Sequence, residues 1–212
     1  MNGNPAVAYY NVTGRLLMFA RNSAVDGSGS WQIVVVDSVG VVGLTTSLAV
    51  VNGNPAISYY DNTNGNLKYV RAVDASGTSW GAPVTLDSTG NVGSYTSLAV
   101  VNGNPAISYY EQTNADLRYV RATTASGTLA GDWGAPVTLD STGDVGSYTS
   151  LAVVNGNPAI SYYDQTNGDL RYVRASDASG TTWPAGTTAD SGFGTGNVGR
   201  YTSLAVDRKS VV

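Results

Sequence analysis

The chain has 212 residues, of which 26 are glycine and 14 are tyrosine, and only 12% are charged, with a formal net charge of -4. This composition indicates short strands joined by tight turns, and apolar residues at helical spacing are absent. Without a block of lysine or arginine there is no basic surface for nucleic acid or an anionic membrane, so neither partner is expected. Cysteine and histidine are both absent, so neither a metal nor a cofactor is expected.

One phrase, Asn-Gly-Asn-Pro-Ala, begins at Asn2, Asn52, Asn102 and Asn155. The repeats are therefore spaced by 50, 50 and 53 residues, and an insertion around Leu129 to Asp132 accounts for the longer third spacing. Periods of about 40 to 50 residues that hold several short strands are typical of propeller blades.

Each repeat is predicted to hold four antiparallel strands. Asn-Gly-Asn-Pro favours a tight reversal after the first strand, and a second polar turn separates the next two. In representative copies the four strands run from Thr96 to Val101, Ala106 to Tyr110, Leu67 to Arg71 and Val84 to Asp87.

The two ends of the chain complement one another. The first repeat begins at its second strand, Pro5 to Tyr10, and the chain ends with a first strand, Thr202 to Val206. We therefore predict an all-β fold with one domain over residues 1–206. It is a four-bladed β-propeller with four antiparallel strands in each blade, closed as a ring by the C-terminal strand, which completes the first blade and covers its open edge. Residues 207–212 form a tail. A monomer is expected, and a strand-swapped oligomer is the alternative.

The stretch Asp177-Ala-Ser-Gly-Thr-Thr-Trp183 resembles the Asp-box repeats of bacterial sialidase-like propellers. Comparable stretches are Asp74 to Trp80, Asp26 to Trp31 and Thr123 to Trp133. The Asp-to-Gly spacing is one residue too long at Asp74 and Asp177, and the third copy has no matching Asp. In that family the box is a turn on the side away from the active site, so the resemblance implies the fold and not an activity.

Sialidase-like catalysis, as the family implies, needs an arginine cluster, a Tyr with a Glu partner and an acid. Glu111 is the only glutamate of the chain, and Asn11, Asp61 and Asp164 hold its place in the other repeats. A residue that varies within a turn is more simply a turn residue than a catalytic carboxylate.

Other repeated residues have structural explanations. Arginines at the ends of the third strands are expected to pair with aspartates or stack on tyrosines, although a ring of guanidinium groups for an anion is the alternative. Tyrosine pairs and tryptophans are expected to pack between blades. Polar loops such as Asp61 to Asn66 are explained as hairpin turns rather than calcium sites. The arginines are Arg21, Arg71, Arg121 and Arg174, the aspartates are Asp37, Asp87, Asp140 and Asp190, and the tryptophans are Trp31, Trp80, Trp133 and Trp183.

One end of the blades is the candidate binding face. It collects the turns after the second strands and the connections from fourth to first strands, and tyrosines beside amides and carboxylates suit the faces and hydroxyl edges of sugars. The longer last connection breaks the four-fold repeat. The candidate ligand-binding residues are Tyr95, Tyr148, Tyr201, Phe193 and Arg200. The alternative is that these tyrosines cap the sheet ends.

From the sequence we therefore predict a non-enzymatic binding or scaffold module, with lectin-like carbohydrate recognition as one form of it, in a secreted or cell-surface bacterial protein. A glycan or an extended peptide is the expected ligand. The missing histidine and the lone glutamate make an acid and base pair hard to assemble. The alternatives are a sialidase-like glycoside hydrolase, degenerate or active, and a structural repeat without a small-molecule ligand.

Overall fold

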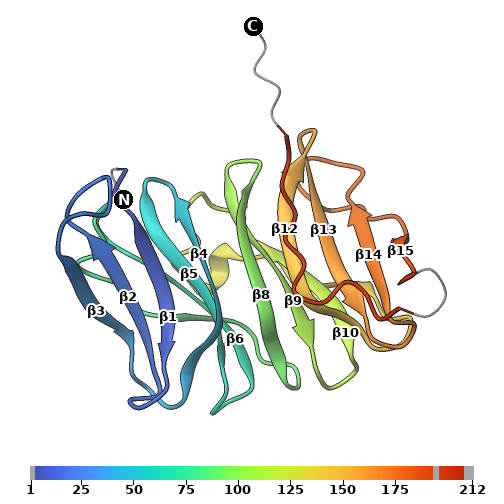
Figure 1. Ribbon diagram of the computed structural model, residues 1–212, viewed down its shortest axis with the longest axis horizontal. Coiled ribbons are helices and arrows are strands. Elements are labelled where there is room, and N and C mark those ends of the chain that lie inside the picture. Colours follow the sequence, from blue (N-terminus) through green and yellow to red (C-terminus); the bar gives the residue numbers. More distant parts are fainter. Residues whose placement is uncertain (1–2, 193–195, 208–212) are drawn as a thin grey trace, which may run out of the picture.

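Four antiparallel sheets make up the computed structural model, which describes residues 3–192 and 196–207 (Figure 1). The first sheet has three strands and the others have four, each a meander in chain order. A 3-10 turn, η1 (Ala130–Asp132), lies in the insertion of the third repeat. None of the described helices is long and apolar enough to span a bilayer. The strands are β1 (Ala6–Asn11), β2 (Leu16–Asn22) and β3 (Trp31–Asp37); β4 (Val42–Val51), β5 (Asn54–Asp61), β6 (Asn66–Arg71) and β7 (Val84–Asp87); β8 (Val92–Val101), β9 (Asn104–Glu111), β10 (Asp116–Arg121) and β11 (Val137–Asp140); and β12 (Val145–Val154), β13 (Asn157–Asp164), β14 (Asp169–Arg174) and β15 (Thr187–Asp190). The predicted all-β, propeller-like class is confirmed.

The Asn-Gly turn joins the first two strands of a blade in the way that the sequence predicts. Asn102 and Gly103 both have positive φ, 45° and 80°. Two consecutive left-handed residues match the twist of antiparallel strands, and asparagine and glycine tolerate this conformation best. The repeated phrase is therefore the signature of a hairpin.

Arginines at the ends of the third strands hold these hairpins. Arg121 donates through Nε to the carbonyl of Val101 and through Nη2 to that of Asn102, both at 3.0 Å. Arg71 and Arg174 do the same in their own blades. The predicted pairing of these three arginines with aspartates is wrong, because the planar guanidinium satisfies two turn carbonyls that lack strand partners.

The repeated aspartates instead join neighbouring blades. The buried Tyr109 hydroxyl donates to Asp87 Oδ2 at 2.7 Å, and Arg118 Nη1 donates to the same oxygen at 2.8 Å. Burial raises the pKa of Tyr109, so its hydroxyl keeps the proton that it donates. The same tyrosine-to-aspartate bond recurs at the other two junctions, from Tyr59 to Asp37 and from Tyr162 to Asp140.

Three of the four tryptophans pack across the same junctions, as the sequence predicts, whereas Trp31 is 47% exposed. Each of the three lies edge-on to an aromatic ring on the third strand of the preceding blade, at a centroid distance usual for such pairs. The pairs are Trp80 with Phe19 at 5.1 Å, Trp133 with Tyr69 at 5.0 Å and Trp183 with Tyr119 at 5.1 Å.

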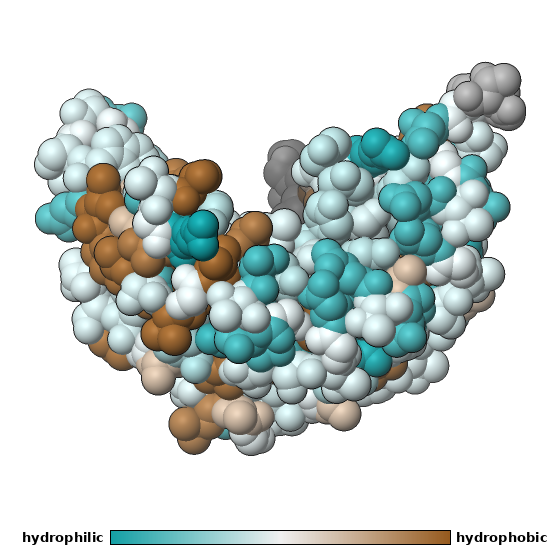
Figure 2. All heavy atoms as spheres, turned by 90° about the horizontal axis from the view of Figure 1, so that it is seen from below, coloured by the Kyte–Doolittle hydropathy of each residue, from teal (hydrophilic) through white to brown (hydrophobic). Residues whose placement is uncertain are grey.

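The arc of blades is open. Figure 2 shows a hollow between two arms, which are formed by the sheets β1–β3 and β12–β15. Residues 202–206 form no described strand and do not pair with β1; they lie along β12 (Figure 1). The predicted closure of the ring is therefore not seen in the described residues.

Local contacts hold the C-terminal segment beside β12. The Leu204 amide donates to Ser150 Oγ at 2.9 Å, and Thr202 Oγ1 donates to the Tyr148 carbonyl at 3.1 Å. First strands of the third and fourth blades contact the preceding first strand in the same way, through Leu98 to Ser47 and Leu151 to Ser97. The segment thus occupies the place of the first strand of a further blade.

Glycine is required where adjacent blades meet most closely. Gly93 has a φ of 104°, and a Cβ there would lie 2.6 Å from the Leu67 Cα. The clash is with backbone, so no side-chain rotation relieves it. The first strand of one blade therefore packs directly against the third strand of the preceding blade.

We expect Gly93→Ala to lower the free energy of unfolding by about 2–4 kcal/mol, from a clash in the core together with the left-handed φ. Gly53→Ala is the control: it has a φ of 81° with nothing within 4 Å of the added Cβ. It should cost only about 1 kcal/mol. Urea unfolding measures both, and equal losses would contradict the close approach.

Candidate functional site

Three tyrosines form a row of contacting rings on the inner side of the arc. The ring centroids of Tyr95 and Tyr148 are 4.4 Å apart and those of Tyr148 and Tyr201 are 4.3 Å apart, with the ring planes tilted by 46° and 51°. The row borders a hollow of about 400 Å³, which is also lined by threonines of β4, β8 and β12 and by Thr202. Tyr201 is 79% exposed, so the row presents aromatic surface to solvent.

A left-handed backbone conformation places each of these tyrosines, within a strand irregularity at Tyr95 and Tyr148. Tyr148 has a φ of 55° and lies within a register shift of the pairing between β12 and β13, which falls between Ser147 and Ser150. Such a bulge turns a side chain away from the regular alternation of a strand. Tyr95 and Tyr201 adopt the same conformation, with φ of 53° and 57°.

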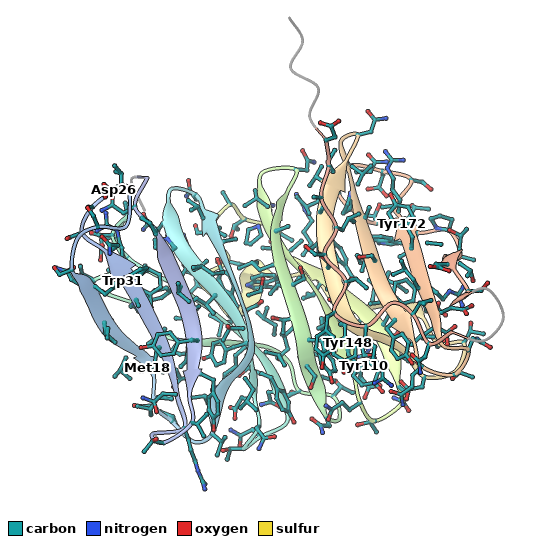
Figure 3. All side chains as sticks on the ribbon, in the orientation of Figure 1. Met18, Asp26, Trp31, Tyr110, Tyr148 and Tyr172 are labelled. Carbon is teal, nitrogen blue, oxygen red and sulfur yellow. The ribbon has the colours of Figure 1, made fainter. Side chains whose placement is uncertain are left out.

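More aromatic and polar groups border the row. The ring centroid of Tyr110 lies 6.2 Å from that of Tyr95, and the ring centroid of Tyr163 lies 6.2 Å from that of Tyr148. The Arg200 guanidinium lies 5.3 Å from the centre of the Tyr163 ring, within the range of a cation–π contact. Figure 3 shows Tyr110 and Tyr148 together at one end of the blades.

Of the five predicted ligand-binding residues, four therefore lie in one region. The row contains Tyr95, Tyr148 and Tyr201, in that order. Arg200 contacts the ring of Tyr163, which lies beside the row. Phe193, the fifth, lies outside the described residues. The structure places these residues together, and their role in binding stays a prediction.

Two carboxylate residues flank a backbone hydrogen bond at the junction of the third and fourth blades. The Val145 amide donates to the Ala115 carbonyl at 2.9 Å. Asp144 directly precedes Val145, and Asp116 directly follows Ala115. Asp144 is half-buried and accepts hydrogen bonds from the Tyr110 hydroxyl and Gln165 Nε2, both at 2.8 Å.

This carboxylate pair breaks the repeat. The same backbone hydrogen bond joins Val92 to Gly65 and Val198 to Gly168. At the junction with Val92 and Gly65, Asn91 takes the place of Asp144 and Asn66 that of Asp116. At the junction with Val198 and Gly168, the corresponding residues are Asn197 and Asp169. Among the described junctions, only that between the third and fourth blades carries two carboxylates at this point.

The two carboxylates differ in environment. Asp116 is 9% exposed, and its pKa is raised, first by burial and then by the negative charge of Glu111, its cross-strand partner. Glu111 is fully buried and accepts from the Thr113 and Asn114 amides, so it serves the turn, as the sequence predicts. A carboxyl group with a raised pKa is a candidate for acid catalysis, and a half-buried carboxylate on the neighbouring blade is a candidate base.

Sequence reasoning missed this pair. Asp116 and Asp144 belong to different blades and lie 28 residues apart, so no short motif joins them. Alignment of the repeats with one another would have revealed it, because the preceding repeat has Asn66 at the position of Asp116 and Asn91 at the position of Asp144. The described residues contain no cluster of three or more His, Cys, Asp or Glu side chains able to hold a metal ion.

Comparisons with known proteins identify the fold. No family model and no curated protein sequence matches the chain. Similar solved structures include the catalytic domain of a GH62 α-L-arabinofuranosidase from Coprinopsis cinerea, with a TM-score of 0.55 and 14% identity over 87% of this chain. A GH62 hydrolase in complex with xylotriose matches 98% of this chain, with a TM-score of 0.57 and 13% identity. An exo-β-1,3-galactanase from Phanerochaete chrysosporium matches 88% of it, with a TM-score of 0.54 and 9% identity.

These neighbours are propeller glycoside hydrolases, and this chain spans 64%, 72% and 49% of their respective chains. At such identities the likeness shows the fold alone. The prediction of a non-enzymatic binding or scaffold module is contradicted by these matches, since the three structures named above are enzymes that act on carbohydrate. The resemblance to sialidase-like Asp-box propellers is not tested by these matches and stays a prediction.

We expect Asp116→Asn to be more stable than the wild type at pH 7. The pKa of Asp116 is raised above its ordinary value of 3.8, so the native state holds this proton at a pH where the unfolded chain has lost it. Stability therefore falls as pH rises through that window. Below it, protonated Asp116 is as neutral as Asn, and the advantage of the variant should shrink.

Thermal unfolding between pH 3.5 and pH 7.5 measures this difference. The matched control is Asn66→Asp, which puts a second carboxyl group opposite Asp61 at the same position of the second blade. It should lower stability at pH 7. A less stable Asp116→Asn variant at neutral pH would contradict the account of this site.

Proposed function

We propose that this chain is a carbohydrate-active propeller of the glycoside hydrolase kind, which binds a glycan along the tyrosine row and cleaves it at the Asp116 and Asp144 pair. The single observation that carries the proposal is the position of this pair. Two carboxylates take the places of the amides of the preceding junction, and Asp144 accepts from the hydroxyl of Tyr110, whose ring lies beside Tyr95. The fold is shared with glycoside hydrolases.

The tyrosine row suits the glycan. Sugars offer apolar ring faces and hydroxyl edges, and tyrosine offers an aromatic face with a polar tip. The neighbours act on or bind arabinose-, xylose- and galactose-containing compounds. A plant-type polysaccharide that contains these sugars is therefore the substrate class we propose.

The chemistry assigns one role to each carboxyl group. Asp116, whose pKa is raised, donates its proton to the glycosidic oxygen as the bond to the anomeric carbon breaks. Asp144, as the carboxylate, takes a proton from the water that attacks this carbon. The Tyr110 hydroxyl and Gln165 Nε2 hold Asp144 in position. The products are two sugars, and a return of the proton to Asp116 resets the pair.

A closed ring of four complete blades would provide a continuous inner wall for such a site. The repeated first strand at residues 202–206 and the three-stranded first sheet support this finer form of the fold.

We expect the purified chain to release reducing sugar from arabinoxylan or β-1,3-galactan, and Asp116→Asn and Asp144→Asn each to lower kcat by about 100-fold or more. Both variants restore the asparagines of the preceding junction, so folding should be preserved. Asp26→Asn is the control, because Asp26 is exposed at the opposite end of the blades (Figure 3) and should leave the rate unchanged. No release from either polysaccharide, or equal rates in all variants, would contradict the proposal.

We expect Tyr148→Ala to raise KM by about 10-fold with a smaller change in kcat, because it removes a stacking face in the middle of the row and leaves the carboxylates in place. Tyr148→Phe keeps the ring and should bind nearly as well as the wild type. Saturation kinetics with a soluble oligosaccharide measures both. An unchanged KM in Tyr148→Ala would place the glycan elsewhere.

A further inference from the structure

One end of the arc carries a blade that lacks its first strand. β1 pairs with β2 on one side, and no described strand pairs with its other edge. Val7 on β1 is 48% exposed, whereas Ile57, at the same position of β5, is fully buried opposite Leu48 of β4. The first blade therefore presents three strands and an open edge.

The other end carries a first strand without the rest of its blade. Residues 202–206 lie on the fourth blade, with the contacts that β8 and β12 make to the blades before them. The face beneath them is partly uncovered: Leu170 and Tyr172 are half-buried, whereas Leu117 and Tyr119 are 0% and 2% exposed. The fourth blade thus lacks the neighbour that the second and third blades have.

The free face of the first blade is apolar. Trp31, Ile33 and Val35 of β3 are 47%, 61% and 50% exposed. Figure 2 shows hydrophobic side chains gathered on the arm that carries β1–β3. The tryptophans of the other blades pack on the preceding blade, so this face is built to meet another blade.

The two free faces hold the two halves of one junction. Each described junction joins a tyrosine of the second strand to an aspartate that ends the preceding blade, and a tryptophan to a third-strand aromatic ring. The first blade carries the corresponding tyrosine and tryptophan, Tyr9 and Trp31. The fourth blade carries the corresponding aspartate and third-strand aromatic ring, Asp190 and Tyr172. Asp190 is exposed and Tyr172 is half-buried.

We propose that the two part-blades join within one chain. Residues 202–206 pair with β1 and complete the first blade, with Leu204 opposite Val7 in the register of Leu48 with Ile57, Leu98 with Ile107 and Leu151 with Ile160. Trp31 then packs on Tyr172, and Tyr9 donates to Asp190. The first strand at one end and the three strands at the other make one blade of the same kind as the others, with no part left over.

The partner surface is on the same chain rather than on a second copy. An intramolecular junction forms at an effective concentration that does not depend on dilution. Closure requires the two arms that border the hollow in Figure 2 to approach one another, through changes of angle at the junctions between blades. This inference does not depend on the proposed hydrolase activity.

Engineered cysteines test the junction, because the chain has no cysteine of its own. Opposite residues of antiparallel strands have Cα atoms about 4.5–5.5 Å apart, within the range that a disulfide spans. In the Val7→Cys/Leu204→Cys double variant we expect an intrachain disulfide after mild oxidation, in a monomer of 21.9 kDa. A mixture of the two single variants should give no interchain disulfide. Val7→Cys/Val100→Cys is the control, since Val100 is 38% exposed on β8 and should not crosslink.

Three results would decide whether the two part-blades join within one chain. An intrachain disulfide in the first double variant alone, with the circular dichroism of the wild type, supports closure within one chain. A disulfide between the two single variants, with a mass above that of a monomer, overturns the proposal in favour of a second copy. A folded double variant that forms no disulfide also overturns it, because the two ends then do not meet.

Discussion

The contact between neighbouring blades is the interaction on which the rest of the structure depends. A sheet of four short strands buries little by itself, and here each sheet presents large side chains on both faces. Tyr109 shows how the junction is made: its ring fills the core and its hydroxyl reaches Asp87 of the preceding blade. The buried aspartate is satisfied by that donor and by Arg118, which avoids the cost of an unpaired charge. Repetition of this one junction orders the whole arc.

The fold follows from the sequence where it depends on local chemistry. The Asn-Gly hairpin, the four strands of each repeat and the packing of Trp80 were all predictable, because turn residues and alternating strands act within a few residues. The roles of the arginines were not, since Arg121 finds its carbonyl partners 19 and 20 residues away. Ring closure was not settled either, because it depends on small angles summed over several junctions. The site was half predictable. The tyrosines stood out by type, whereas Asp116 and Asp144 are related only through the hydrogen bond between the backbones of their neighbours, Val145 and Ala115.

A repeat protein can acquire a specific site only by departing from its own repeat. Asn66 and Asn91 show what the fold uses at this junction when no charge is needed. The third and fourth blades carry Asp116 and Asp144 at these positions, which adds negative charge near Glu111. The pKa of Asp116 is raised by burial and by the charge of Glu111, so its ionised form is unfavourable there. A destabilising substitution in a scaffold that offers a neutral alternative is more typical of a functional site than of a structural one.

The tyrosine row supports the same distinction between scaffold and site. The left-handed backbone at Tyr95, Tyr148 and Tyr201 also occurs at Thr45, where the φ is 47°. The bulge therefore belongs to the fold and does not require an aromatic side chain. Burial does not require one either, because Tyr201 is 79% exposed. What the tyrosines add is a continuous polarisable surface, with centroids 4.3–4.4 Å apart, that ends beside Tyr110 and its hydrogen bond to Asp144. This surface and the Asp144 carboxylate beside it are the features that support our proposal of a sugar polymer as ligand.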